Sequence, residues 1–183
     1  MGRGRQFVSQ YPKELLTQAD HLLRPAKGKP TQADLRRAVS SAYYALFHFL
    51  IEEATLSIVG TARAKEPLRQ LVGRGFNHTA MREASTEMFK GTPRDLLKPF
   101  WPRYGVSTNP TLQNLARLFV VLQQERHRAD YDLSQPLALD EAEALVQQAR
   151  DAISDWGTLK KNAPEIAQFY ALSLFCWNNW ETR

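Results

Sequence analysis

Apolar residues recur at steps of three and four along most of the chain, which is the spacing of one face of an α-helix. The first such pattern begins at Pro12 and ends near Gly28, where proline and glycine residues interrupt it. Its apolar positions are Leu15, Leu16, Ala19, Leu22 and Leu23. The pattern predicts a first amphipathic helix over this segment.

A second and longer helix is predicted to open at Thr31. The segment from Thr31 to Asp34 has the form of a capping box, in which a hydroxyl and an acidic side chain satisfy the first free backbone N–H groups. The apolar positions that follow are again three or four residues apart: Leu35, Val39, Ala42, Leu46 and Leu50. An alternation of period two, which would indicate a strand, is absent from this segment.

The rest of the chain continues the helical pattern, with one less regular part between residues 60 and 110. There we predict a helix near 79–90 and another over 94–100, separated by proline and glycine turns. A clear helix follows, with apolar positions at Leu112, Leu115, Ala116, Phe119 and Leu122. Asp140, with Glu143, is predicted to cap the next helix, and Pro164 suits the first turn of a final helix reaching about Trp180.

Five or six helices with mostly short connections predict an all-α fold, an antiparallel up-and-down helical bundle. We expect residues 1–9 to be a flexible basic N-terminus and residues 10–161 to form the bundle. Residues 162–183 are expected to form an aromatic C-terminal helix that packs on the bundle or on a partner chain.

The composition of the chain is that of a globular protein and excludes several other classes. The chain has 183 residues, of which 43% are hydrophobic and 23% charged, as expected for one globular domain. No apolar run reaches the roughly 18 residues that span a membrane, and no apolar signal core follows the basic N-terminus. The single cysteine, Cys176, excludes an internal disulfide and a cysteine zinc site. We therefore expect a cytoplasmic protein without a metal or another cofactor.

The charge is positive and unevenly distributed. The formal net charge is +5, and residues 63–103 hold nine lysines and arginines against four acidic residues. A concentrated basic stretch is compatible with an anionic partner such as RNA or DNA. Many basic proteins bind no nucleic acid, so the charge alone does not decide the function.

Polar side chains form a row on the second predicted helix. They lie at steps of three and four and therefore share one face: Arg37, Ser41, Tyr44, His48 and Glu52. This face is either the solvated side of the helix or a packed boundary, and the bulk of Tyr44 and His48 favours the boundary.

Residues 126–132 read Arg-His-Arg-Ala-Asp-Tyr-Asp at the end of a predicted helix. In a structural interpretation, Arg126 and Asp130 form a buried ion pair four residues apart, and Tyr131 caps the core. In a functional interpretation, Arg126 binds a phosphate with both arms of its guanidinium, and His127 or Tyr131 lies nearby. The sequence favours the structural interpretation.

Two motifs in this order resemble the HEPN superfamily. The first is the run from Arg36 to His48, which contains Tyr-Tyr-Ala-Leu-Phe-His, and the second is the segment from Arg126 to Asp132. The chain is most similar to small stand-alone HEPN proteins, over about residues 10–160. His78 corresponds to a polar loop residue that is common in these proteins.

The resemblance implies a HEPN-like bundle that forms a homodimer and acts in a toxin–antitoxin, phage-defence or RNA-processing system. Catalytic members are metal-independent endoribonucleases, and stand-alone members often pair with a small nucleotidyltransferase. The resemblance makes Arg126, His127 and Tyr131 the candidate catalytic residues. Together with the polar row, it makes Arg37, Tyr44, His48 and Asp130 the candidate ligand-binding residues.

The chain departs from the HEPN pattern at one position. The catalytic histidine of the family falls at residues 131–133, which here are Tyr131, Asp132 and Leu133. Tyrosine and aspartate exchange protons poorly near neutral pH, whereas histidine does so well. The leading hypothesis is therefore a non-enzymatic or weakly active HEPN-like module that binds RNA or a nucleotide and works with a protein partner in a defence or stress system. The alternatives are an active ribonuclease toxin and a bundle that only binds other proteins.

Overall fold

The computed structural model describes residues 10–92, 98–99, 102 and 109–176. These residues form seven α-helices and one 3-10 turn, with no strand among them, so the predicted all-α class is confirmed. The elements are α1 (Gln10–Leu23), α2 (Gln32–Val59), η1 (Arg63–Lys65), α3 (Glu66–Gly73), α4 (His78–Lys90), α5 (Pro110–Tyr131), α6 (Leu139–Asn162) and α7 (Pro164–Cys176). The sequence predicted five or six helices, and the short α3 is one that it missed.

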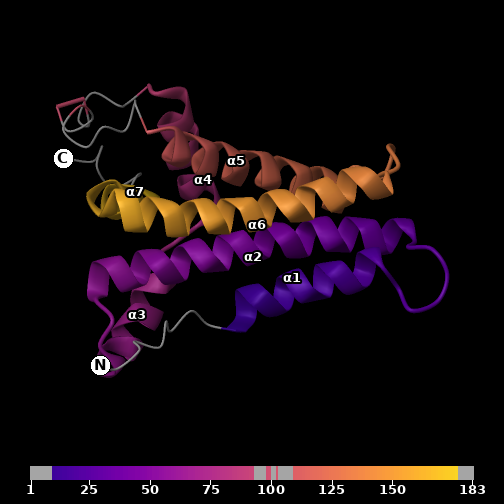
Figure 1. The fold of residues 1–183 in the computed structure, drawn as a ribbon, viewed down its shortest axis with the longest axis horizontal. Coiled ribbons are helices and arrows are strands. Elements are labelled where there is room, and N and C mark those ends of the chain that lie inside the picture. The colour runs from indigo at the N-terminus through magenta and orange to yellow at the C-terminus, as the bar shows by residue number, and fades with distance from the viewer. Residues whose placement is uncertain (1–9, 93–97, 100–101, 103–108, 177–183) are drawn as a thin grey trace.

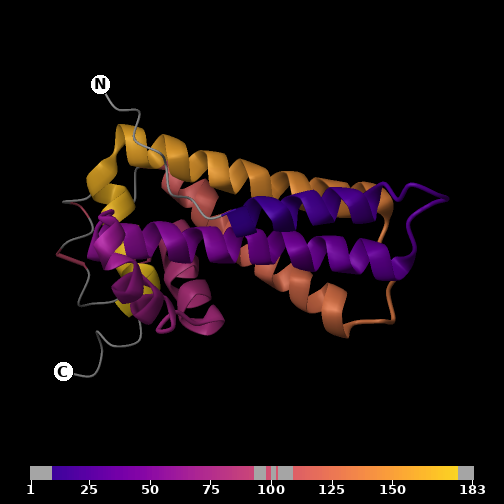
Figure 2. The ribbon, with the colours of Figure 1, turned by 90° about the horizontal axis from the view of Figure 1, so that it is seen from below.

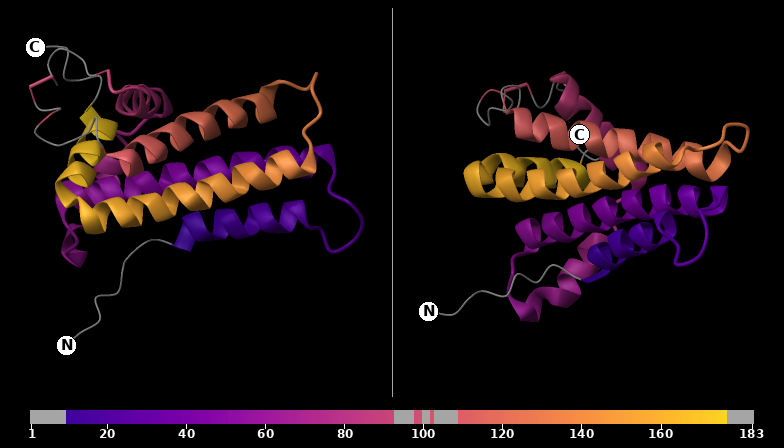
Figure 3. Two further views of the ribbon diagram at one scale, coloured as in Figure 1. Left: turned by 45° about the horizontal axis from the view of Figure 1, so that its top comes forward. Right: turned by 45° about the vertical axis from the view of Figure 1, so that its right-hand side comes forward.

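Helices α1, α2, α5 and α6 lie lengthwise beside one another, and short loops at one end join α1 to α2 and α5 to α6 (Figure 1). Seen from below, α5 crosses α2 at an angle (Figure 2). Helices α3, α4 and α7 gather at the other end of the bundle (Figure 3). Helix α2 packs against α1, α3, α5, α6 and α7, which makes it the central helix of the fold.

The sequence explains where α2 begins and why it is central. The hydroxyl of Thr31 accepts a hydrogen bond from the backbone N–H of Asp34 at 3.2 Å, and the Asp34 carboxylate accepts one from the Thr31 N–H at 2.8 Å. This is the predicted capping box, which satisfies backbone groups that the helix itself leaves free. Apolar side chains on several faces of α2 are buried, including Val39, Leu46 and Leu50, as is expected of a helix packed on several sides.

Helix α6 begins differently from the prediction. It starts at Leu139, and its N-cap residue is Ala138, whose side chain makes no capping hydrogen bond. Asp140 lies inside the first turn, where its carboxylate accepts a hydrogen bond from the N–H of the next residue, Glu141, at 2.9 Å. The prediction of an Asp140 cap was therefore wrong, although a carboxylate in the first turn still suits the positive end of the helix dipole.

Helix α7 packs on its own bundle, against α2, α4 and α6. Tyr170, Ala171 and Leu174 are buried, and the hydroxyls of Tyr170 and Ser85 are 2.8 Å apart. The predicted continuation to Trp180 and the flexible N-terminus over residues 1–9 lie outside the described residues, as does most of the predicted helix at 94–100.

One buried carboxylate ties α2 to α6. The side chain of Glu53 is 3% exposed, and its Oε2 accepts hydrogen bonds from Trp156 Nε1 at 2.8 Å and Lys160 Nζ at 2.6 Å. A buried charge is tolerated when it is paired and hydrogen-bonded in this way. The contact fixes how α2 and α6 lie against each other.

Among the described residues, no single helix is both long and apolar enough to cross a membrane. Helix α2 passes such a test only in combination with residues 63–73, from which it is separated by a bend of 110°.

Candidate functional site

The last turns of α5 hold Arg126 in contact with α2. Arg126 Nη2 donates a hydrogen bond to the Tyr44 hydroxyl at 2.8 Å, and Nε lies 2.8 Å from Asp130 Oδ2 on the same helix. The Nε contact is an ion pair and not a hydrogen bond, because the N–H is not directed at the carboxylate. The guanidinium carbon also lies 5.4 Å from the centre of the Tyr44 ring and 5.6 Å from that of Tyr131. Arg126 therefore stands between two aromatic rings, a geometry that stabilises a cation.

Asp130 links this arginine to the central helix. Its Oδ1 accepts a hydrogen bond from the buried hydroxyl of Ser40 at 2.5 Å, while Oδ2 faces Arg126. The predicted ion pair between Arg126 and Asp130 is present, but the side chains are 23% and 26% exposed, so the pair is only partly buried. Ser40, which the sequence did not single out, is the residue that anchors the pair to α2.

Tyr131 does not cap the core, and that prediction was wrong. Its side chain is 65% exposed, at the C-terminal end of α5. The Tyr131 ring instead lies beside His127, with ring centres 4.7 Å apart, and both residues line a cavity at the surface.

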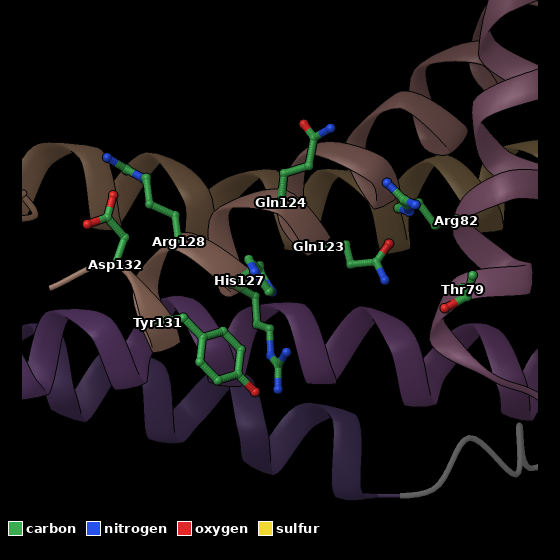
Figure 4. A pocket seen from close by; sticks show the side chains of 9 residues that line it. Thr79, Arg82, Gln123, Gln124, His127, Arg128, Tyr131 and Asp132 are labelled. Carbon is green, nitrogen blue, oxygen red and sulfur yellow. The ribbon is translucent and has the colours of Figure 1, made fainter.

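This cavity, which we call the arginine cavity, has a volume of about 780 Å³ and lies between α4 and α5. It is lined by Thr79, Arg82, Gln123, Gln124, Arg126, His127, Arg128, Tyr131 and Asp132. Figure 4 shows Thr79 and Arg82 projecting from α4 on one side and the α5 side chains along the other. Three arginines against one carboxylate make its lining basic.

The arginines are not equally available to a ligand. Arg128 forms ion pairs with Glu125 at 2.7 Å and with Glu141, so its charge is largely neutralised. Arg126 is engaged through Nε and Nη2, and Nη1 is its remaining nitrogen. Asp130 and Tyr44, working against burial, raise the pKa of Arg126 above its usual range. The guanidinium therefore stays charged.

The polar row of α2 divides between two surfaces. Tyr44 faces Arg126, whereas Arg37, Ser41, Tyr44 and His48 line a second, smaller cavity of about 370 Å³ beside α1. His48 is half-buried there, with its ring centre 5.1 Å from that of Tyr11 and 6.2 Å from that of Tyr44. Burial lowers the pKa of His48, so this side chain is neutral at pH 7. The row is thus a packed boundary at Tyr44 and His48 and solvated at Arg37.

The structure brings His78 to this site, where the sequence had given it only a place in a loop. His78 is the first residue of α4, and its Nδ1 is 2.6 Å from the hydroxyl of the buried Tyr43. One face of the imidazole stacks on Phe47, with ring centres 4.0 Å apart and planes inclined by 23°. The ring also lies 6.0 Å from that of Tyr44, the residue that binds Arg126. The Tyr-Tyr-Ala-Leu-Phe run was the feature of the sequence that could have indicated this position. Its aromatic side chains are the ones that contact the imidazole.

The surroundings of His78 and Tyr43 determine the protonation state of both side chains. Burial lowers the pKa of His78, and the positive charge of Arg126 and the nearby His48 lower it further. Burial also raises the pKa of Tyr43 well above that of a free phenol, so its hydroxyl keeps its proton. At neutral pH the charged guanidinium of Arg126 therefore lies near a neutral imidazole.

No protein-family model, curated protein or solved structure matches this chain. Within the part of the chain that the structure describes, no group of three or more histidine, cysteine or acidic side chains is arranged to hold a metal ion.

Proposed function

We propose that the protein is a HEPN-like up-and-down helical module that binds RNA or a nucleotide through phosphate groups in the arginine cavity. The observation that carries the proposal is the position of Arg126 at the edge of this cavity, between the rings of Tyr44 and Tyr131. Arginine binds phosphate well because it offers several charged N–H donors, and Nη1 is the nitrogen of Arg126 that neither Tyr44 nor Asp130 engages. The exposed ring of Tyr131 offers a face on which a base can stack.

The wider context rests on the resemblance to HEPN proteins. It comprises a role in a defence, stress or toxin–antitoxin system and a small nucleotidyltransferase as protein partner. The order of the two motifs supports it, as does their meeting in space, since Arg126 from the second motif donates a hydrogen bond to the Tyr44 hydroxyl from the first.

RNA binding is expected to be weak and sensitive to salt, because it depends on neutralising phosphates and releasing counterions. Arg82→Gln should weaken binding of a single-stranded RNA and reduce the slope of log affinity against log salt by about 1. Arg117→Gln is the matched control, since Arg117 is an exposed arginine of α5 that does not line the cavity. Gel retardation at salt concentrations of about 50 to 200 mM measures both variants. Absence of retardation by the parent protein at the lowest salt concentration would contradict RNA binding.

We further propose that the protein is a homodimer that associates through the Arg126 end of the bundle, through α7, or through both. Large apolar side chains are exposed on each surface: Leu133 is 77% exposed beside the cavity, and Leu172 is 42% exposed on α7. Light scattering at micromolar concentration is expected to give twice the monomer mass of 20.9 kDa. Leu133→Ser and Leu172→Ser should separate the two surfaces, because only the variant at the interface will shift to monomer. A parent protein that scatters only as a monomer would disprove the dimer.

A further inference from the structure

We propose that a cavity between α1, α2 and α6 binds a small amphipathic anion, that is, an apolar chain or ring carrying one negatively charged group. The cavity, which we call the lysine cavity, has a volume of about 470 Å³, within the usual range of small-molecule sites. Figure 1 shows that α1 begins partway along α2 and α6, and residues of its first turns line the cavity. None of the described residues lines both this cavity and the arginine cavity, so the proposal goes beyond RNA binding and does not depend on it.

The interior of the lysine cavity is apolar and comes from three helices. It is lined by Leu16 of α1, Phe49 of α2, and Ile153 and Trp156 of α6. Phe49 and Trp156 are 7% and 1% exposed, whereas Leu16 and Ile153 are only partly buried against the core. Covering these apolar side chains with an apolar chain or ring removes their surface from water, which favours binding.

Gly157, in the wall of the cavity, is the second observation that indicates a ligand. Glycine is among the least favourable residues inside a helix, yet Gly157 lies within α6. Its φ is not positive, and a Cβ at this position would meet no described atom within 4 Å. Neither the backbone conformation nor the packing of the described residues therefore requires glycine here. The missing side chain leaves the α6 backbone open to the cavity, where a ligand can approach it closely.

A lysine is held at the cavity by the buried carboxylate of Glu53. Lys160 Nζ lies 2.6 Å from Glu53 Oε2, and the two side chains are 47% and 3% exposed. An ammonium group has three donors, so Lys160 can still donate to a second anion. Because Glu53 already fixes the ammonium, a ligand loses little side-chain entropy by binding to it.

Two further lysines give the cavity an excess of positive charge. Lys13 and Lys161 also line it, are exposed, and form no ion pair with any described residue. Three lysines thus stand against the one carboxylate of Glu53, whose charge Lys160 offsets. This charge complements an anion and disfavours a cation of the same size.

The experiment uses two anions and one cation as probes. Anilinonaphthalenesulfonate is an aromatic monoanion that becomes fluorescent when it binds an apolar site, and octanoate is an aliphatic one that should displace it. Octylammonium has the same chain length as octanoate and the opposite charge. The parent protein is expected to bind the fluorescent probe and to release it to octanoate. Octylammonium should compete about tenfold less well or worse, because it meets the lysines with a like charge.

Gly157→Leu is expected to fill the cavity without harming the fold. It should weaken binding of both anions by about tenfold or more, since the leucine occupies the space that the ligand needs. The melting temperature should rise by about 2–4 °C, because leucine is more favourable than glycine inside a helix. Gly157→Ala is the matched control: it should give a similar rise in melting temperature but change the affinity by about twofold or less.

Replacing both Lys13 and Lys161 by glutamine tests the charge. The double variant should bind octanoate about fivefold more weakly than the parent at low salt, and the difference should shrink as salt is added. Lys27→Gln combined with Lys29→Gln is the matched control. It makes the same change of charge in the loop between α1 and α2, away from the cavity, and should bind like the parent.

The outcomes decide the proposal without reference to RNA. A parent protein that binds neither anion overturns it, as does Gly157→Leu that binds both anions like the parent. Octylammonium that competes as well as octanoate overturns the preference for an anion. If Gly157→Leu does not fold, the two pairs of lysine variants decide, because all four lysines are exposed. Equal affinity of these two double variants for octanoate would then overturn the proposal.

Discussion

Replacing Glu53 by alanine is expected to destabilise the protein by about 3 kcal/mol, because a buried donor then loses its acceptor and a cavity is left between helices. Trp156 is 1% exposed, and its indole N–H has Glu53 Oε2 as its acceptor at 2.8 Å. Lys160 contributes less to this cost, because its side chain is 47% exposed and its ammonium group can be hydrated when the carboxylate is removed. At roughly 2–4 °C per kcal/mol for a chain of this size, the melting temperature should fall by about 6–12 °C.

Glu53→Gln is the matched control. The glutamine carbonyl still accepts from the Trp156 N–H, and only the ion pair with the half-exposed Lys160 is lost, so the expected cost is about 1 kcal/mol. Thermal unfolding followed by circular dichroism measures both variants. Equal melting temperatures for the alanine variant and the parent would show that the carboxylate does not hold α2 against α6.

The sequence predicted those parts of the fold that depend on neighbouring residues. The capping box at Thr31 and Asp34 involves atoms three residues apart, so it was visible in the sequence and is present in the structure. The same reasoning failed at α3, in which no residue is buried and Leu68 and Leu71 remain exposed. Helix α3 has only eight residues and adds no more than the partly buried Val72 to the edge of the core, and so short a segment gives a weak periodic signal.

The candidate site shows the same limit. The ion pair of Arg126 with Asp130 spans one helical turn, and its presence followed from the spacing. Contacts between residues far apart in the sequence could not be predicted in this way. Ser40 contacts Asp130, 90 residues further along the chain, and Tyr43 contacts His78, 35 residues further along. The exposure of Tyr131 depends on which helix covers the end of α5, which periodicity within α5 does not specify. The place of His78 beside Tyr43 and Tyr44 is likewise set by tertiary packing and not by a local pattern.

The second large effect concerns Arg126, which serves both the fold and the site. Arg126→Ala removes a hydrogen bond to Tyr44, an ion pair with Asp130 and the contact with two rings. The Arg126 side chain is 23% exposed, and Asp130 keeps its hydrogen bond from Ser40 when the arginine is removed. The loss in free energy of unfolding should therefore lie between that of a surface substitution and that of a broken buried ion pair, at about 2 kcal/mol. The melting temperature is expected to fall by about 4–8 °C. RNA binding should fall by more than tenfold, since each lost phosphate contact of this kind is worth about 1.4 kcal/mol or more.

Asp130→Asn distinguishes the two roles of Arg126. Asparagine keeps an oxygen for the Ser40 hydroxyl but loses the charge that faces Arg126, so stability should fall by only about 1 kcal/mol. The guanidinium, released from its carboxylate, should bind RNA as tightly as in the parent or more tightly. Thermal melts and gel retardation on the same preparations test this.

If both variants melt like the parent while RNA binding disappears in each, Arg126 and Asp130 act only as a binding site and the structural role is wrong. If Arg126→Ala unfolds at a lower temperature yet binds RNA like the parent, the arginine is part of the scaffold and the phosphate site lies elsewhere.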